Sequence, residues 1–151
     1  SIDIEDACLV LKSGYSGKCG LFDLSDGKQV IDFRYDDITL LGFNRALGKD
    51  GSRRYLLDTS TGDVIASLPP NIGAAHFNET PVTWIFRAKS YYGIIDEEGN
   101  ILYEDAKDPL TGVTKFRHGF SGGQKDNKKW GILKSDGTWL VHPTYDYIKL
   151  L

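Results

Sequence analysis

The stretch Lys129-Trp130-Gly131-Ile132-Leu133-Lys134 is one of four similar segments whose regular spacing decides the fold. Each segment begins with large or basic residues, usually has a glycine next, and continues with two apolar residues and usually an aspartate. The other three segments are residues 18–23, 53–58 and 91–96. The four glycine positions are 35 to 38 residues apart, and such a regular step indicates a tandem repeat.

A turn glycine follows the end of each segment by three or four residues. Glycine adopts the positive φ that a short hairpin needs, and a preceding aspartate caps the turn with its side chain. Because these features recur in phase, we interpret the repeated residues as scaffold. The scaffold positions are Gly20, Asp23, Gly27, Tyr55, Asp58, Gly62, Tyr92, Gly93, Asp96, Gly99, Trp130, Gly131 and Gly137.

Short apolar runs lie before and after each segment and are bounded by turn residues, which is typical of β-strands. Each repeat is therefore predicted to be a three-stranded antiparallel meander. The sequence predicts a single all-β domain over residues 1–151, a tandem array that is either an open twisted solenoid or propeller-like. It leaves open whether residues 145–151 pair with the first repeat or with another chain. The predicted repeats are residues 7–38, 44–72, 82–110 and 116–148.

The fourth repeat resembles a full WG (or KWG) repeat through residues 129–133, Asp136-Gly137 and residues 142–148. The third repeat matches through residues 92–96 and Gly99. The first repeat keeps its glycines and Asp23 but has a cysteine at the tryptophan position. The second repeat is the most degenerate, because Tyr55 occupies the glycine position, and it must pack differently.

The resemblance implies a bacterial β-repeat protein without catalytic residues. Some such modules act as antitoxins that bind an effector, so we expect a non-enzymatic module that binds another protein. An immunity protein for a secreted effector is the specific form of this hypothesis. The alternative is a carbohydrate or cell-envelope binder that uses Trp84, Trp139 or Tyr91 as a sugar platform. The compartment stays open between bacterial cytoplasm and periplasm or envelope.

Charge and hydropathy narrow the range of partners. The net charge of −3 argues against a nucleic-acid partner, which needs a surplus of Lys and Arg on one face. No apolar stretch approaches the roughly 20 residues that span a bilayer. The chain starts at Ser1, which fits a processed chain or an excised domain. The sequence does not predict an oligomeric state.

The sequence contains no recognisable catalytic or metal-binding motif, such as a P-loop, a nucleophile elbow or HExxH. Its histidines, at positions 76, 118 and 142, are far apart. We therefore expect no catalytic residue, no metal and no cofactor. A catalyst would need carboxylates or histidines that converge in a pocket. The acidic residues Glu104, Asp105 and Asp108 are interpreted as a solvated loop, and residues 125–129 as a charged hairpin tip.

Cys8 and Cys19 are the only cysteines in the chain. A tight turn at Ser13-Gly14 would place them opposite each other in a hairpin, where a disulfide can form. A turn at Tyr15-Ser16 would put them out of register and leave two half-buried thiols.

Departures from the repeat pattern are the better candidates for function, because loop residues need not serve the core. The longest irregular stretch is residues 69–83, and the next strand has two aromatic residues that alternate. That aromatic face is either core or a protein-binding patch. Residues 116–120 form a second candidate. The candidate partner surface comprises His76, Phe77, Asn78, Glu79, Trp84, Phe86, His118 and Phe120.

Overall fold

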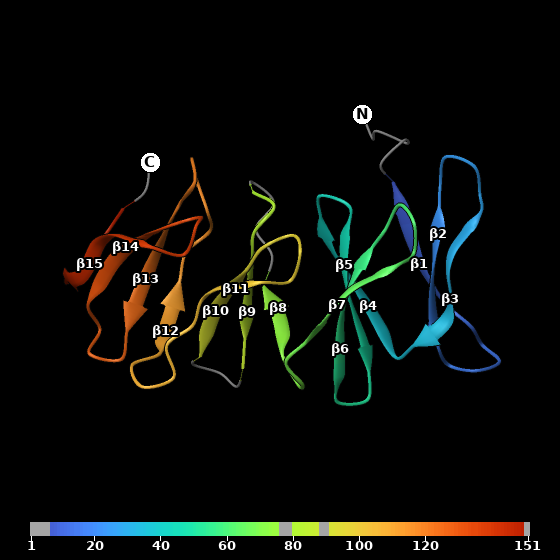
Figure 1. Cartoon of the computed structure of the whole chain (residues 1–151), viewed down its shortest axis with the longest axis horizontal. Helices are drawn as coiled ribbons and strands as arrows, with labels where there is room; N and C mark the ends of the chain where they lie inside the picture. The colour runs from blue at the N-terminus through green and yellow to red at the C-terminus, as the bar shows by residue number, and fades with distance from the viewer. Residues whose placement is uncertain (1–6, 76–79, 88–90, 150–151) are drawn as a thin grey trace. The chain divides into compact units, whose positions relative to one another are not determined.

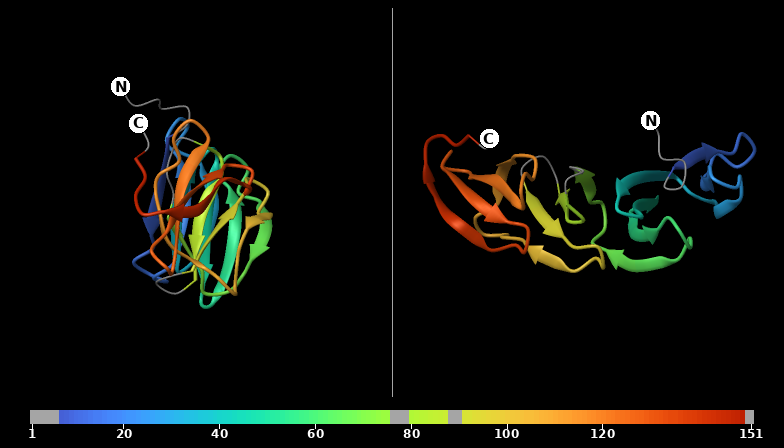
Figure 2. Two further views of the ribbon diagram at one scale, coloured as in Figure 1. Left: turned by 90° about the vertical axis from the view of Figure 1, so that its left-hand side faces the viewer. Right: turned by 90° about the horizontal axis from the view of Figure 1, so that it is seen from above.

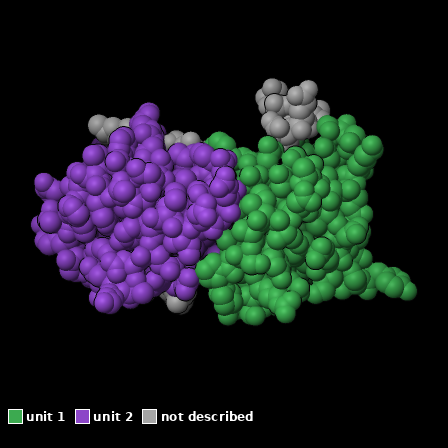
Figure 3. All heavy atoms as spheres, viewed as in Figure 1, with its two compact units in different colours: residues 1–71 green, residues 72–151 purple. Residues whose placement is uncertain are grey.

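The computed structural model describes residues 7–75, 80–87 and 91–149, and all its regular elements are β-strands (Figure 1). The strands are named β1 to β15 in chain order and pair antiparallel. The described ranges contain no helix, and hence none with the length and hydropathy to cross a membrane. The predicted all-β class is confirmed. The chain divides into two compact units, residues 1–71 and 72–151 (Figure 3).

Unit 1 contains two separate sheets (Figures 1 and 2). Residues of both sheets build one core, in which Leu21 and Tyr35 from the first sheet meet Ala46 and Leu57 from the second. The first sheet contains β1 (Cys8–Lys12), β2 (Cys19–Asp23) and β3 (Gln29–Tyr35). The second contains β4 (Asp37–Gly42), β5 (Arg45–Asp50), β6 (Arg53–Asp58) and β7 (Val64–Leu68).

Unit 2 is built on one sheet with strand order β15-β14-β13-β12-β10-β9-β8, and β11 pairs with β10 beside this path. Its core contains Trp84, Leu110, Phe116 and Leu133, each 0% exposed. The strands are β8 (Gly73–Ala75), β9 (Thr83–Phe86), β10 (Tyr92–Ile95), β11 (Ile101–Tyr103), β12 (Leu110–Val113), β13 (Phe120–Lys125), β14 (Trp130–Lys134) and β15 (Trp139–Tyr145).

The structure adds one strand to the predicted three-stranded repeat. β4, β8 and β12 come just before the meanders of the second, third and fourth repeats and pair with their first strands. Ile38, which the sequence places at the end of the first repeat, lies in β4 opposite Gly48 of the next repeat. The sheets are therefore offset from the sequence repeats. The first meander strand of the fourth repeat also starts at Phe120 rather than near Phe116.

The repeated glycine of the Trp-Gly pair lies opposite an irregularity in the neighbouring strand. The β2–β3 register shifts between Cys19 and Leu21, and the β14–β15 register shifts next to Gly131. A Cβ at Gly131 would lie 2.4 Å from the Val141 carbonyl oxygen, so no side chain fits. Around Tyr55 the β6–β7 register is regular, which makes room for a side chain in the second repeat.

The glycines of the four predicted turns have positive φ, between +72° and +88°. They are Gly27, Gly62, Gly99 and Gly137. Asp23 and Asp58 each accept hydrogen bonds from the hydroxyl and the N–H of the serine two residues later. Asp96 accepts the N–H of Glu98 and of Asn100. In the fourth turn Lys134 replaces this aspartate, and Asp136 caps the turn by accepting from Thr138. Short polar side chains thus satisfy the turn backbone in each repeat.

Two of these turn glycines also form contacts between repeats. A Cβ at Gly62 would lie 2.2 Å from the carbonyl oxygen of Val30 in the first repeat. A Cβ at Gly137 would lie 2.3 Å from the carbonyl oxygen of Leu102 in the third repeat. The turn of one repeat therefore packs against the backbone of the repeat before it, and only glycine allows this approach.

The two cysteines do not form a disulfide. The loop between β1 and β2 centres on Tyr15-Ser16, so Cys8 lies opposite Asp23 and Cys19 opposite Lys12. Of the two alternatives left open by the sequence, the out-of-register hairpin is the one the chain adopts.

Candidate interaction site

The hairpin turn between β4 and β5 presents an aromatic side chain at its tip. Phe43 and Asn44 are its central residues, at φ +52° and +59°, and Gly42 pairs with Arg45 across it. Positive φ at both central positions defines a type I′ turn, for which Asn and Gly are preferred. Asn44 fits this preference and Phe43 does not, because a bulky residue is strained in the left-handed region. The Phe43 ring is also 47% exposed.

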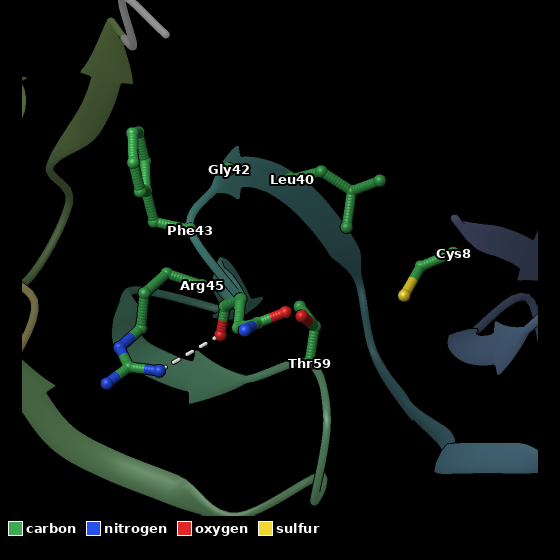
Figure 4. Close-up of a pocket in the computed structure, with 7 residues that line it drawn as sticks. Cys8, Leu40, Gly42, Phe43, Arg45 and Thr59 are labelled. Atoms are coloured by element: carbon green, nitrogen blue, oxygen red, sulfur yellow. Dashed lines mark hydrogen bonds between the residues drawn. The ribbon is translucent and has the colours of Figure 1, made fainter. Parts of the chain in front are cut away.

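A pocket of about 460 Å³ lies beside this turn, and we call it the turn pocket. Figure 4 shows the lining side chains projecting from β1, from the β4–β5 hairpin and from the residue after β6. Its wall is mixed, with apolar groups and a thiol next to amide, hydroxyl and guanidinium groups. Such a wall suits a partner side chain that is apolar with a polar end. The lining residues are Cys8, Leu40, Gly42, Phe43, Asn44, Arg45 and Thr59.

Hydrogen bonds hold the polar side of the turn pocket in place. The Asn44 carbonyl accepts the Thr59 N–H at 3.0 Å and an Arg45 guanidinium N–H at 3.1 Å. Arg45 also lies 3.6 Å from Asp58. The Ser60 hydroxyl, with further N–H donors and the Arg45 charge, holds the pKa of Asp58 below its ordinary value. The pocket therefore carries a paired cation and anion at its margin and is close to neutral.

The backbone hydrogen bond between this hairpin tip and the turn after β6 has counterparts in other repeats. The Thr59 N–H donates to Asn44, the Ser135 N–H donates to Gly119, and the Leu24 N–H donates to Ala7. His118 and Gly119 form the corresponding tip of the fourth repeat, at φ +54° and +82°. Residues 76–79, which precede the third repeat, lie outside the described residues.

Four of the predicted surface residues, His76, Phe77, Asn78 and Glu79, therefore have no structural account. Trp84 is placed in the core, 0% exposed, with its ring stacked on Phe116 at 5.4 Å. A ring in this position cannot meet a partner in the folded chain, so Trp84 leaves the candidate surface. Burial decides here between the two readings of its strand face.

Phe86 shares the strand of Trp84 but lies at the rim of the sheet, 36% exposed. Its ring covers Gly73 and lies 6.2 Å from the Tyr92 ring. His118 is exposed at its hairpin tip, and Phe120, two residues on, is half-buried. The structure places these three residues on unit 2, in separate strands and turns.

Sequence reasoning missed Phe43 and Asn44. The predicted repeats end at residue 38 and resume at residue 44, so the turn at their boundary has no predicted role. The segment Gly42-Phe43-Asn44 between two apolar runs was the available signal, since glycine and asparagine tolerate positive φ.

The acidic cluster of residues 104–108 is tied to a buried cation. Lys125 is 6% exposed, and its ammonium donates to the Tyr103 hydroxyl at 3.0 Å, to Asp105 at 3.2 Å and to the Asp108 carbonyl. Hydrogen bonds from the Asp108 N–H and from Lys125 lower the pKa of Asp105. Lys125 is therefore not part of a charged hairpin tip, and the loop is not simply solvated. The cluster fastens residues 104–109 to β13.

The described residues contain no group of three or more His, Cys, Asp or Glu side chains that could hold a metal ion. In the turn pocket the thiol of Cys8 and the hydroxyl of Thr59 have no histidine or carboxylate among the lining residues. The lining residues offer apolar contact and hydrogen bonds for binding.

Residues 130–150 match the model of a family described as WG containing repeat. The predicted resemblance is confirmed there, for one copy. No curated protein matches the sequence.

Solved structures show the same kind of fold at low sequence identity. The computationally designed protein Ika8 is similar with a TM-score of 0.54 and 11% identity, covering 89% of this chain and 45% of that one. The designed protein Ika4 has a TM-score of 0.51 and 16% identity, with 84% of each chain covered. Hsv2p of Kluyveromyces lactis has a TM-score of 0.51 and 12% identity, covering 89% and 44%. The chain spans less than half the length of Ika8 and Hsv2p, and the likeness concerns the fold alone.

Proposed function

Starting from a chain that carries a WG repeat at residues 130–150, we propose that it is a non-enzymatic module that binds another protein at the turn pocket. The observation that carries this proposal is Phe43, an exposed aromatic side chain kept at positive φ beside that pocket. Strained residues persist where the surrounding structure holds them, and they cluster at binding sites.

The chemistry of the turn pocket favours a protein partner. Aromatic anchors next to a pocket are the usual hot spots of protein interfaces. The charges at its margin are paired, and the lining offers both apolar contact and hydrogen bonds. A partner segment that inserts an apolar side chain beside Leu40 and pairs its backbone with Asn44 would use both.

The sugar-binding alternative has weaker support. It needs an aromatic ring with an open face, and Trp84 is buried. The Trp139 ring meets Tyr103 edge-on at 5.7 Å and has the Lys125 ammonium over it. The Tyr91 ring has the Arg87 guanidinium over it at 5.9 Å. We therefore favour a protein partner, and an immunity protein for a secreted bacterial effector is the specific form we propose.

The test compares capture of a partner by the wild-type chain and by Phe43→Gly and Phe43→Ala. Lys128→Gly is the matched control, because Lys128 is also an exposed residue at positive φ, +68°, and its replacement leaves the turn pocket intact. We expect a partner to be captured by wild type and by Lys128→Gly, and its binding to fall about tenfold or more in both Phe43 variants.

If the captured protein is toxic when produced alone, co-production of wild type but not of Phe43→Gly should restore growth. Equal capture by all four proteins would contradict the proposed site. Specific binding to a glycan array, with no protein partner, would contradict the proposed class of ligand.

A further inference from the structure

The chain carries two exposed apolar faces, one on β1 and one on β15, that correspond to surfaces buried between its own repeats. Leu9 and Leu11 on β1 are 43% and 42% exposed. Leu140 and Tyr145 on β15 are 54% and 56% exposed. Exposed apolar side chains of this size, gathered on one strand, commonly mark an interaction surface.

The packing of the first repeat on the second shows what such faces do when they meet. The Val30 carbonyl lies against the turn glycine Gly62, and the Tyr35 ring lies against Gly48 of β5. Tyr35 is 2% exposed, and its ring is 6.1 Å from that of Tyr55. The outer strand of one repeat thus covers the first meander strand and the turn of the next.

The third and fourth repeats pack in the same way. Leu102 stands at the position of Val30 and lies against Gly137, and Leu110 stands at the position of Tyr35 and lies against Gly123. Leu110 is 0% exposed. This contact therefore occurs once in each compact unit, with different side chains in the same register.

On β15, the face that corresponds to the outer strand of this contact is uncovered. By register, Leu140 is the counterpart of Val30, and Tyr145, opposite Trp130, is the counterpart of Tyr35, opposite Cys19. The ion pair Lys18–Asp36 also recurs as Lys129–Asp146. Asp36 is 47% exposed because it also accepts the Gly51 N–H of the following repeat, whereas Asp146 is 86% exposed.

The first repeat leaves uncovered the other side of this contact, which consists of the first meander strand and the turn. Gly27 is the counterpart of Gly62 and Gly137, yet a Cβ at Gly27 would meet nothing within 4 Å. Leu9 is the counterpart of the buried Ala46 and Ser121, and Leu11 that of Gly48 and Gly123. Among the described strands, β1 pairs only with β2, whereas β5 is flanked by β4 and β6.

We propose that the β15 face of one copy of this chain packs on the β1 face of a second copy, head to tail. The second copy is the occupant to which the chemistry points, because the chain itself carries both halves of a contact that it already makes internally. The two faces have the same apolar character, and Asp146 brings the acceptor that Asp36 supplies inside the array.

The contact between copies has larger residues on its β1 side than the internal contacts have, since Leu9 and Leu11 replace small residues, and Leu11 lowers its strength. A Cβ at Gly48 would come within 2.9 Å of the Tyr35 ring, so Leu11 keeps Tyr145 farther from β1 than Tyr35 is from β5. The association is therefore weaker than the internal contact and depends on concentration. Because the two faces are different, their contact is heterologous, and its polarity is testable.

The test uses sedimentation of the chain over a range of concentrations with two variants that each disable one face, Leu11→Arg and Leu140→Arg. Wild type should associate reversibly, and each variant alone should bind itself about tenfold or more weakly, since Arg brings charge into an apolar contact. Ile101→Arg, at an aliphatic residue of β11 that is 44% exposed, is the matched control and should behave as wild type.

Mixing the two variants then decides the polarity of the contact. Leu11→Arg keeps an intact β15 face and Leu140→Arg keeps an intact β1 face, so the mixture should form a heterodimer that neither forms alone. A wild-type chain that stays monomeric at every concentration would overturn the proposal, including the case in which one chain closes on itself. Association of wild type without complementation in the mixture would overturn the head-to-tail arrangement. Circular dichroism verifies that each variant is folded.

Discussion

At the scale of single residues, Phe43 combines two properties that seldom occur together. It is bulky and exposed, and it has the backbone conformation that glycine prefers. A left-handed conformation costs a non-glycine residue about 1–2 kcal/mol. Since nearly half of Phe43 is exposed, its side chain is available as a contact for a partner.

The conformation of Phe43 predicts that a glycine variant is more stable than an alanine variant, which is the reverse of the usual order. Phe43→Gly should be more stable than Phe43→Ala by about 1 kcal/mol, because both remove the ring but only alanine keeps the strain. The free energy of unfolding in urea measures this difference. At Val64, the exposed first residue of strand β7, the alanine variant should be the more stable one. The same order at both positions would show that Phe43 is not strained.

At the scale of elements, the β-turn after each repeated segment joins three local requirements. Its glycine has positive φ, an aspartate satisfies its N–H groups, and in two repeats the turn lies against the backbone of the preceding repeat. The first two requirements are visible in the sequence, because they involve residues within four positions of each other. The third depends on which strand lies nearby.

Gly27 and Gly62 separate turn strain from inter-repeat packing. Gly27→Ala should cost about 1 kcal/mol, since only its φ of +72° opposes a side chain. Gly62→Ala should cost about 3 kcal/mol or more, because the new Cβ would also meet the Val30 carbonyl. Thermal or urea unfolding of the two variants provides the comparison. Equal losses would mean that the repeats do not pack through this turn.

The turn aspartates predict a loss of stability in acid. The pKa of Asp58 is lowered in the folded chain, chiefly by the Ser60 hydroxyl. Its contribution is therefore present above the ordinary carboxyl pKa of about 3.9 and is lost as the pH falls through the lower folded value. Asp58→Asn keeps an acceptor oxygen but does not titrate. The difference in unfolding free energy between wild type and this variant should shrink as the pH falls from about 3.9 through the lower folded pKa. A constant difference would contradict the assignment.

At the scale of the whole molecule, each compact unit has a hydrophobic core built from its own described residues. Each sheet formed by the described strands lies within one of the two units. Hydrogen bonds within sheets therefore make each unit cooperative by itself. A destabilising substitution in one unit should therefore increase local unfolding mainly in that unit.

Lys125→Met tests this division. It leaves Asp105, Asp108 and Tyr103 without their buried cation and should cost about 2 kcal/mol, because both carboxylates can still reach water. Amide hydrogen exchange should show faster exchange across β9 to β15, while the β-strands of unit 1 keep their protection. Loss of protection to the same extent in both units would show that the chain unfolds as one body.

The sequence alone determined the all-β class, the turns and the family resemblance at residues 130–150. All of these follow from residues close together in the chain, where periodicity, glycine and short polar side chains govern the backbone. Only the tertiary structure decided the offset between sheets and repeats, the burial of Trp84, the pairing of Lys125 with the acidic loop, and the exposure of Phe43. These depend on which strand lies beside a residue, and pairing between strands distant in sequence is set by packing of the whole sheet and not by local preference.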